Sequence, residues 1–274
     1  MGAVVAPRAS AGRAPRSGPK PFCGAGRNGA VAGLIALALL ALALGACGAE
    51  APAAPAGPPA FTRTVDLSHV VRQDMPRPPD EPPPQLARAD DGRLAQITIG
   101  ARTGLPVRVV AAPGAAPADV EALSPRDLVL PAVVIDARDQ AQDTPTFALG
   151  TAEILAWERA HGTIPRGALV LLATGWDVRW GDTAAYMNPG ADGAPRAPGF
   201  APAAAELLID QRGAAGLGID APALSFTPAS GFALLLENLT SLEQLPPTGA
   251  TVVIGALKLQ AAHASPARVI ALVP

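Results

Sequence analysis

Cysteine and histidine are scarce in this chain of 274 residues, which has two cysteines and three histidines. Cys23 and Cys47 both lie near the N-terminus, ahead of the region that we expect to fold. That region therefore has no disulfide and no cysteine-based metal site. The histidines are His69, His161 and His263, so none lies between 70 and 160 to form a cluster of imidazole ligands there.

Other signatures are absent as well. The sequence has no P-loop, no dinucleotide-binding fingerprint and no G-x-S-x-G elbow, so nothing supports the enzyme classes that depend on them. No acidic residue precedes Glu50, whereas five basic residues do, at positions 8, 13, 16, 20 and 27. A chain without its first 46 residues keeps 16 of the 21 basic residues and all 23 acidic ones, a net charge of −7. This charge argues against nucleic acid as the main partner.

The N-terminal segment is typical of export. After the basic stretch, Val31–Ala46 contains only Ala, Leu, Val, Ile and Gly, and it is shorter than the roughly 20 residues that span a bilayer. It ends in Leu44-Gly45-Ala46-Cys47, which resembles a bacterial lipobox. We therefore predict a lipoprotein signal peptide at 1–46 and anchoring to the bacterial cell envelope through acylated Cys47. The alternative is an ordinary secretory signal with a chance cysteine.

The remaining chain divides into a tether and one domain. Residues 47–60 are rich in Pro, Ala and Gly and have nothing to bury. Residues 61–274 are long enough for a single domain with a substantial core. Apolar runs of strand length recur there, and two segments, 151–161 and 202–212, predict helices that end at Gly162 and Gly213. Most strand runs are apolar throughout, which predicts an α/β layer fold with a mostly buried sheet.

One stretch of the domain, Ile97–Gly114, is strand-like on both sides of a break at Arg102-Thr103-Gly104. Further segments around it match one known pattern when they are taken together. They are VDLSH from Val65, PAVVIDAR from Pro131, LLATGWDVRWGD from Leu171, and PGF, GLGIDAPALS, ENLTSLEQLPPTGATVVIGALKL and SPARVIAL towards the C-terminus. In these segments the domain resembles the cyclase family, whose best-known members are bacterial kynurenine formamidases. The resemblance implies a single α/β domain with a central mixed, partly barrel-like sheet and flanking helices, and it leaves room for a homo-oligomer.

The family's chemistry rests on the motif H-x-G-T-H-x-D-x-P-x-H, whose side chains hold zinc or manganese together with a later His and Glu. The metal generates the hydroxide that attacks an amide or formamide carbonyl. Here the motif falls on 102–112, where Thr103 and Gly104 fit. The ligand positions carry side chains that cannot bind a metal in this setting: Arg102, Pro106, Arg108 and Ala112. The resemblance therefore predicts no metal cofactor and retains one family ligand, Glu237.

A lone buried carboxylate at Glu237 would need a cation. Arg102 and Arg108 stand where the family has metal ligands, so our sharpest hypothesis is that a guanidinium replaces the metal as the counter-charge to Glu237. The alternative is that both arginines face solvent on a remodelled loop. Further pocket candidates, each of which has a purely structural alternative, are His69, Trp176, Phe200 and Asp220.

Three functions remain open from the sequence. The first is a lipid-anchored, non-catalytic relative of the family that binds a small anionic or aromatic ligand in the former pocket. The second is an active amide or formamide hydrolase with unexpected metal ligands. The third is a structural or interaction lipoprotein in which the fold serves as a scaffold.

Overall fold

The structure is a computed structural model that describes residues 61–116, 118–222 and 224–274. The predicted signal peptide and the tether, with Cys47, lie outside these residues. No helix of the described part is long and apolar enough to cross a membrane.

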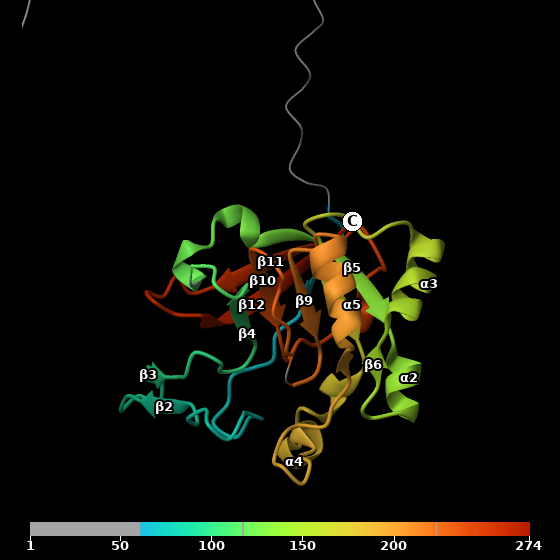
Figure 1. Ribbon diagram of the computed structural model, residues 1–274. Helices are drawn as coiled ribbons and strands as arrows, with labels where there is room; N and C mark the ends of the chain where they lie inside the picture. Colours follow the sequence, from blue (N-terminus) through green and yellow to red (C-terminus); the bar gives the residue numbers. More distant parts are fainter. Residues whose placement is uncertain (1–60, 117, 223) are drawn as a thin grey trace, which may run out of the picture. The chain divides into compact units, whose positions relative to one another are not determined.

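Seven strands of the domain close into a barrel of mixed sheet (Figure 1). The order around the barrel is β12-β11-β5-β7-β9-β10-β4, and β4 pairs back onto β12, while β1 extends the sheet beside β12. Closure satisfies the backbone groups that an open sheet would leave at its edges. The predicted α/β domain with a central mixed sheet is confirmed. The eight strands of this sheet are β1 (Arg63–Asp66), β4 (Pro106–Ala111), β5 (Val129–Asp136), β7 (Leu169–Ala173), β9 (Gly216–Ile219), β10 (Phe232–Leu236), β11 (Thr251–Ala256) and β12 (Ala264–Val273).

Alternation along the strands fills two hydrophobic cores. Leu169 and Leu171 of β7 point into the barrel, whereas Val170 and Leu172 point outward against the helices. Both faces are apolar, which is why these strands are continuous apolar runs in the sequence. Inside the barrel, Gly218 leaves space, since a Cβ there would lie 2.6 Å from the Leu171 side chain.

The helices of the described part are short. They are α2 (Arg138–Asp143), α3 (Thr151–His161), α4 (Thr183–Met187) and α5 (Pro202–Glu206), which continues as a π-helical segment, Leu207–Gln211. Figure 1 shows α3 and α5 beside the sheet and α4 below it. The helices expected at 151–161 and 202–212 are both present. Single 3-10 turns lie at Val120–Ala122, Pro125–Asp127, Trp176–Arg179 and Leu242–Gln244.

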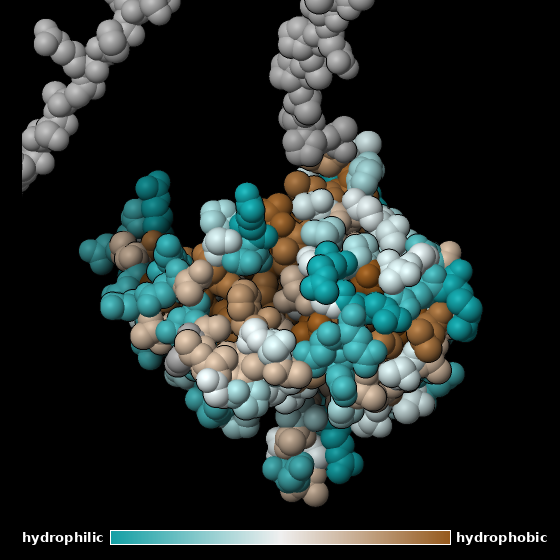
Figure 2. Space-filling model, turned by 45° about the horizontal axis from the view of Figure 1, so that its top comes forward, coloured by the Kyte–Doolittle hydropathy of each residue, from teal (hydrophilic) through white to brown (hydrophobic). Residues whose placement is uncertain are grey.

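Two small strand pairs lie outside the barrel: β2 (Gln85–Arg88) with β3 (Leu94–Thr98), and β6 (Ala148–Leu149) with β8 (Gly199–Phe200). The β2–β3 hairpin extends away from the barrel in Figure 1. Figure 2 shows hydrophobic residues reaching the surface near the middle of the face, with hydrophilic residues around them.

The topology brings distant segments to one edge of the barrel. Strands β5, β7, β9 and β10 are parallel, so their carboxyl ends meet there. The start of β4 joins them, because Val107 of this antiparallel strand pairs with Leu236 at the end of β10. The break at Arg102–Gly104 therefore lies beside Glu237, at the edge where ligands bind in open parallel α/β sheets.

Candidate functional site

A cavity of about 420 Å³ lies at this edge of the barrel. Its wall combines two cations and three acids with apolar side chains, most of them prolines. Arg102 and Arg108 lie on it together with Glu237, so the cavity occupies the position where the resemblance places the family's chemistry. The other lining residues are Pro78, Pro79, Asp80, Met187, Asp192, Gly193, Ala194, Pro195, Pro222, Leu224 and Ser225.

Arg108 and Glu237 form an ion pair in the wall. Arg108 Nη2 lies 2.9 Å from Glu237 Oε1, and the side chains are 24% and 12% exposed. The same oxygen accepts a hydrogen bond of 2.8 Å from the Leu224 backbone N–H, and Arg108 Nη2 also donates to the Leu224 carbonyl. The predicted guanidinium partner of Glu237 is therefore present, and the pair fastens the backbone at Leu224 to the barrel.

The strand register explains this contact. Arg108 lies opposite Leu235 on the antiparallel pair β4–β10, and Glu237 follows Leu235 by two residues on the same face. Diagonal neighbours of this kind lie about 7–8 Å apart at the backbone, within reach of long side chains. Val107 and Val109 point into the barrel core, so Arg108 between them points outward, towards the cavity.

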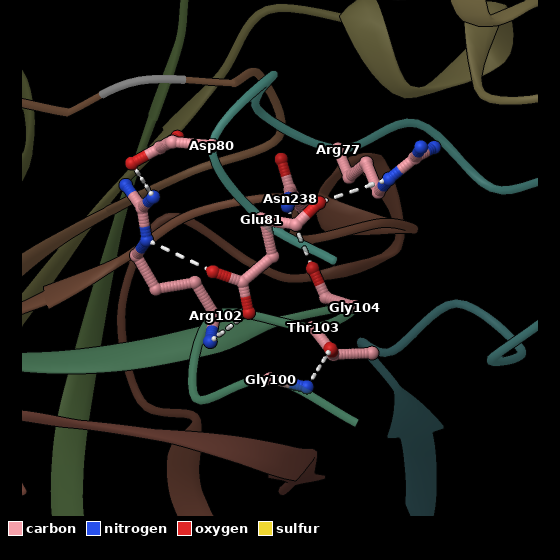
Figure 3. Close-up of polar contacts among 8 residues, drawn as sticks. All are labelled: Arg77, Asp80, Glu81, Gly100, Arg102, Thr103, Gly104 and Asn238. Atoms are coloured by element: carbon pink, nitrogen blue, oxygen red, sulfur yellow. Dashed lines mark hydrogen bonds and ion pairs between the residues drawn. The ribbon is translucent and has the colours of Figure 1, made fainter. Parts of the chain in front are cut away.

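Arg102 has other partners (Figure 3). Its Nη2 lies 2.6 Å from Asp80 Oδ2, and its Nε lies 3.4 Å from Glu81 Oε2. The Arg102 backbone N–H also donates to Glu81 Oε1 at 3.0 Å. The loop that carries both acids contains six prolines between Met75 and Pro84, and Arg102 holds it against the barrel. The guanidinium that pairs with Glu237 is therefore that of Arg108, whereas Arg102 forms ion pairs with Asp80 and Glu81.

A buried network fixes the turn after Arg102. Gly104 has a φ of +70°, and its carbonyl accepts from Asn238 Nδ2 at 2.6 Å. The Tyr186 hydroxyl donates to Asn238 Oδ1 at 2.9 Å. Burial, together with the Asp220, Asp177 and Glu237 charges, raises the pKa of Tyr186 well above its usual value, so this hydroxyl stays protonated and remains a donor.

Asp220 lies behind this network and does not line the cavity. Its Oδ2 accepts from the backbone N–H groups of Thr174 and Gly175 at 2.8 and 2.7 Å, and its Oδ1 accepts from the Thr174 hydroxyl. Burial raises the pKa of Asp220 to about 7, even though these hydrogen bonds act in the opposite direction. Asp220 therefore ties the end of β9 to the turn after β7, which is the structural alternative for this residue.

The remaining pocket candidates also lie away from the cavity wall. His69 stacks on Trp180 with ring centroids 4.1 Å apart, and burial lowers its pKa. Trp176 is 2% exposed, packs in the outer core and donates to the Tyr186 carbonyl. Phe200 belongs to β8 and packs against the same core. None of these three side chains lines the cavity.

The last two motif positions do not line the cavity. Pro106 is buried and begins β4, and Ala112 follows the strand and donates its N–H to the Gly231 carbonyl at 2.9 Å. Among the described residues, no three or more His, Cys, Asp or Glu side chains form a group that could hold a metal ion.

Sequence reasoning missed Asp80 and Glu81, which lie in the loop of six prolines between Met75 and Pro84. The pair of adjacent acids inside a Pro-rich segment was the available signal. It also missed Leu224, which takes part through backbone groups that carry no sequence signature.

The fold and the site define a class of protein that other chains share. The family model "Putative cyclase" matches residues 65–225, more than half of the chain. The chain belongs to the cyclase family, so the resemblance derived from the sequence is confirmed. It also resembles solved structures described as metal-dependent hydrolases, one of them from Bacillus stearothermophilus at 22% identity and a TM-score of 0.56, a similarity that shows the fold alone.

More similar relatives are isatin hydrolases. The curated isatin hydrolase of Roseibium aggregatum is 35% identical over 167 residues, which cover 56% of this chain and 63% of that protein. This chain thus matches less than two thirds of that relative's length. Isatin hydrolase A of Ralstonia solanacearum has a TM-score of 0.70 at 26% identity, covering 92% of this chain and all of that one. Isatin hydrolase A of Labrenzia aggregata, bound to benzyl benzoate, has a TM-score of 0.68 at 29% identity, covering 77% and 93%.

Proposed function

We propose that this protein binds a small aromatic carboxylate in the cavity at Arg108 and does not carry out the metal-dependent hydrolysis of its family. The observation that carries the proposal is the ion pair between Arg108 and Glu237. It puts a guanidinium against the one family ligand position that the sequence retains.

The side chains around the pair do not fit a metal. Guanidinium groups have no lone pair to offer, and neither Pro106 nor Ala112 has a side-chain donor. Glu237 Oε1 already accepts from Arg108 and from the Leu224 N–H. A metal at this point would also meet the Arg108 charge at close range, which opposes binding. Both the residue types at the motif positions and the contacts of Glu237 are therefore unsuited to a metal ion.

The cavity suits a small ligand with a planar apolar body and an oxygen-bearing end. A volume of about 420 Å³ lies in the range of small-molecule sites, which are mainly apolar with a few placed polar groups. The hydrogen bonds of Arg108 to described residues run through Nη2. Its Nε is buried without a partner among them, so Nη1 is the group left for a ligand oxygen. Relatives are named for isatin, and one holds benzyl benzoate. Both compounds are small aromatic carbonyl compounds.

Benzoate provides a direct test. The full-length chain is purified in mild detergent, and benzoate binding is measured by calorimetry, with Arg108→Lys as the variant. The lysine keeps the charge opposite Glu237 but loses the planar donor fork, so we expect roughly tenfold weaker binding, the equivalent of one charge-assisted hydrogen bond. Arg88→Lys, on the exposed hairpin, is the matched control and leaves the affinity unchanged.

Metal content and turnover, together with benzoate binding, distinguish the proposed function from the two other functions. The same preparation is incubated with zinc and manganese, analysed for bound metal, and assayed with isatin and a formamide substrate. We expect neither stoichiometric metal nor hydrolysis. Bound metal together with turnover that Glu237→Gln abolishes would establish the active hydrolase instead. Absence of both turnover and benzoate binding would favour the structural or interaction lipoprotein.

The predicted lipid anchor also bears on where the protein is located. We propose that acylated Cys47 holds the protein at the cell envelope, and that the tether 47–60 separates the domain from the membrane surface. The lipobox-like end of the apolar run supports this location.

A further inference from the structure

Two adjacent acids of the Pro-rich loop meet the same cation, Arg102, as Figure 3 shows. Glu81 is buried, with 8% of its side chain exposed, whereas Asp80 is 74% exposed. Arg102 lines the cavity together with Asp80, and its own side chain is 28% exposed. The two carboxylates thus differ in burial, and the Asp80 carboxylate is the more accessible to solvent and to a ligand.

Both the side-chain carboxylate and the backbone carbonyl of Glu81 accept hydrogen bonds. Its carboxylate accepts from the Arg102 backbone at 3.0 Å, and its carbonyl accepts from Arg77 Nε at 3.0 Å. A Cβ on Gly100 would lie 1.8 Å from Glu81 Oε1, so the carboxylate occupies space that glycine leaves open. Removing the cation from a buried carboxylate is costly. Glu81 is therefore the permanent partner of Arg102.

Asp80 is the replaceable partner. Exposed ion pairs are worth about 0–1 kcal/mol in water. Glu81 already balances the Arg102 charge, so Asp80 adds a second anion to one cation. This surplus contact is made by Nη2, at 2.6 Å, on the wall of the cavity. A carboxylate that enters the cavity can take the place of Asp80 without leaving Arg102 or Glu81 unpaired.

We infer that Nη2 of Arg102 is an anion subsite for the carboxylate of the ligand, and that Asp80 occupies this subsite when the cavity is empty. The inference rests on the proposed function, because it describes binding in the same cavity. Asp80 competes with the carboxylate of the ligand for Arg102 Nη2. It therefore lowers the affinity for carboxylates and leaves the affinity for neutral compounds of the same shape unchanged. Displacement of Asp80 also frees the outer side of the loop from the barrel.

Two probes and three forms of the full-length protein test the subsite. Benzoate and its neutral isostere benzamide are titrated into the wild type, Asp80→Asn and the control Asp90→Asn. Asp90 is an exposed acid of the nearby hairpin turn, so its replacement changes the net charge equally but removes no contact with Arg102. We expect Asp80→Asn to bind benzoate about two- to fivefold more tightly, the range that corresponds to an exposed ion pair. Benzamide binding and the Asp90→Asn variant stay within twofold of the wild type.

Each other outcome overturns the subsite. Equal gains for benzoate and benzamide would mean that the substitution merely opens the loop. Equal gains in Asp80→Asn and Asp90→Asn would mean a long-range charge effect. Unchanged benzoate binding in Asp80→Asn, with wild-type binding that still depends on Arg108, would refute the subsite and leave the proposed function standing. If no form binds either probe, the proposed function fails together with the subsite.

Discussion

Replacing Arg108 by methionine removes the guanidinium while keeping a long apolar stem between β4 and the loop at Leu224. The variant leaves the Glu237 carboxylate, 12% exposed, with one backbone N–H as its partner, and it leaves the Leu224 carbonyl without its donor. Truncation of one partner of a fully buried ion pair costs about 3–5 kcal/mol. Arg108 is 24% exposed, and water can solvate part of the site, so we expect a loss of about 2–4 kcal/mol in the free energy of unfolding.

Urea unfolding, followed by the fluorescence of the three tryptophans, measures this loss. Arg268→Met is the matched control, because Arg268 Nη2 lies 2.7 Å from Asp66 Oδ2 in a pair whose side chains are 72% and 45% exposed. It should cost less than about 1 kcal/mol. A double-mutant cycle with Glu237→Gln isolates the pair, and we expect a coupling energy above about 1 kcal/mol. A loss no larger than that of Arg268→Met, or a coupling energy near zero, would refute the reasoning.

Two further predictions concern titration and anchoring. Burial raises the pKa of Asp220 to about 7, above its unfolded value of 3.8, so the folded state holds this proton more tightly. The resulting stability is fully present below the unfolded pKa and is lost as the pH rises through 7. We therefore expect the urea midpoint to fall less steeply between pH 5 and 8 in Asp220→Asn than in the wild type. An equal dependence on pH in both proteins would contradict the raised pKa of Asp220. Cys47→Ser should move the protein from the membrane fraction to the soluble fraction, whereas Cys23→Ser, inside the predicted signal peptide, should leave it membrane-bound; release by both or by neither would rule out acylation at Cys47.

The sequence predicted most of the barrel because its strands are apolar on both faces. The strands Val129–Asp136 and Leu169–Ala173 lie within the mainly apolar runs 129–137 and 168–174 of the sequence. Short elements were harder to recognise. The helices Arg138–Asp143 and Thr183–Met187 are five or six residues long and show too few turns for a helical period to appear.

The pairing of Arg108 with Glu237 could be proposed from the sequence, since a buried carboxylate needs a cation and two arginines stood at the former ligand positions. The choice between the arginines could not be made, because it depends on the register of β4 against β10. The partners of Arg102 lie 21 and 22 residues earlier in the chain. No local pattern relates Asp80 or Glu81 to the break, since the path of a Pro-rich loop depends on the surface against which it packs.

The sequence by itself determined the family, the apolar strands, the break at Arg102–Gly104 and the replacement of ligand residues around it, because each of these depends on residue type and local spacing. Only the tertiary structure decided which acid pairs with which arginine, and that Trp176, Phe200 and Asp220 do not line the cavity. The physical reason is closure of the barrel. It fixes the register of β4 beside β10 and folds the Pro-rich loop onto Arg102, and these long-range contacts leave no trace in any short stretch of the chain.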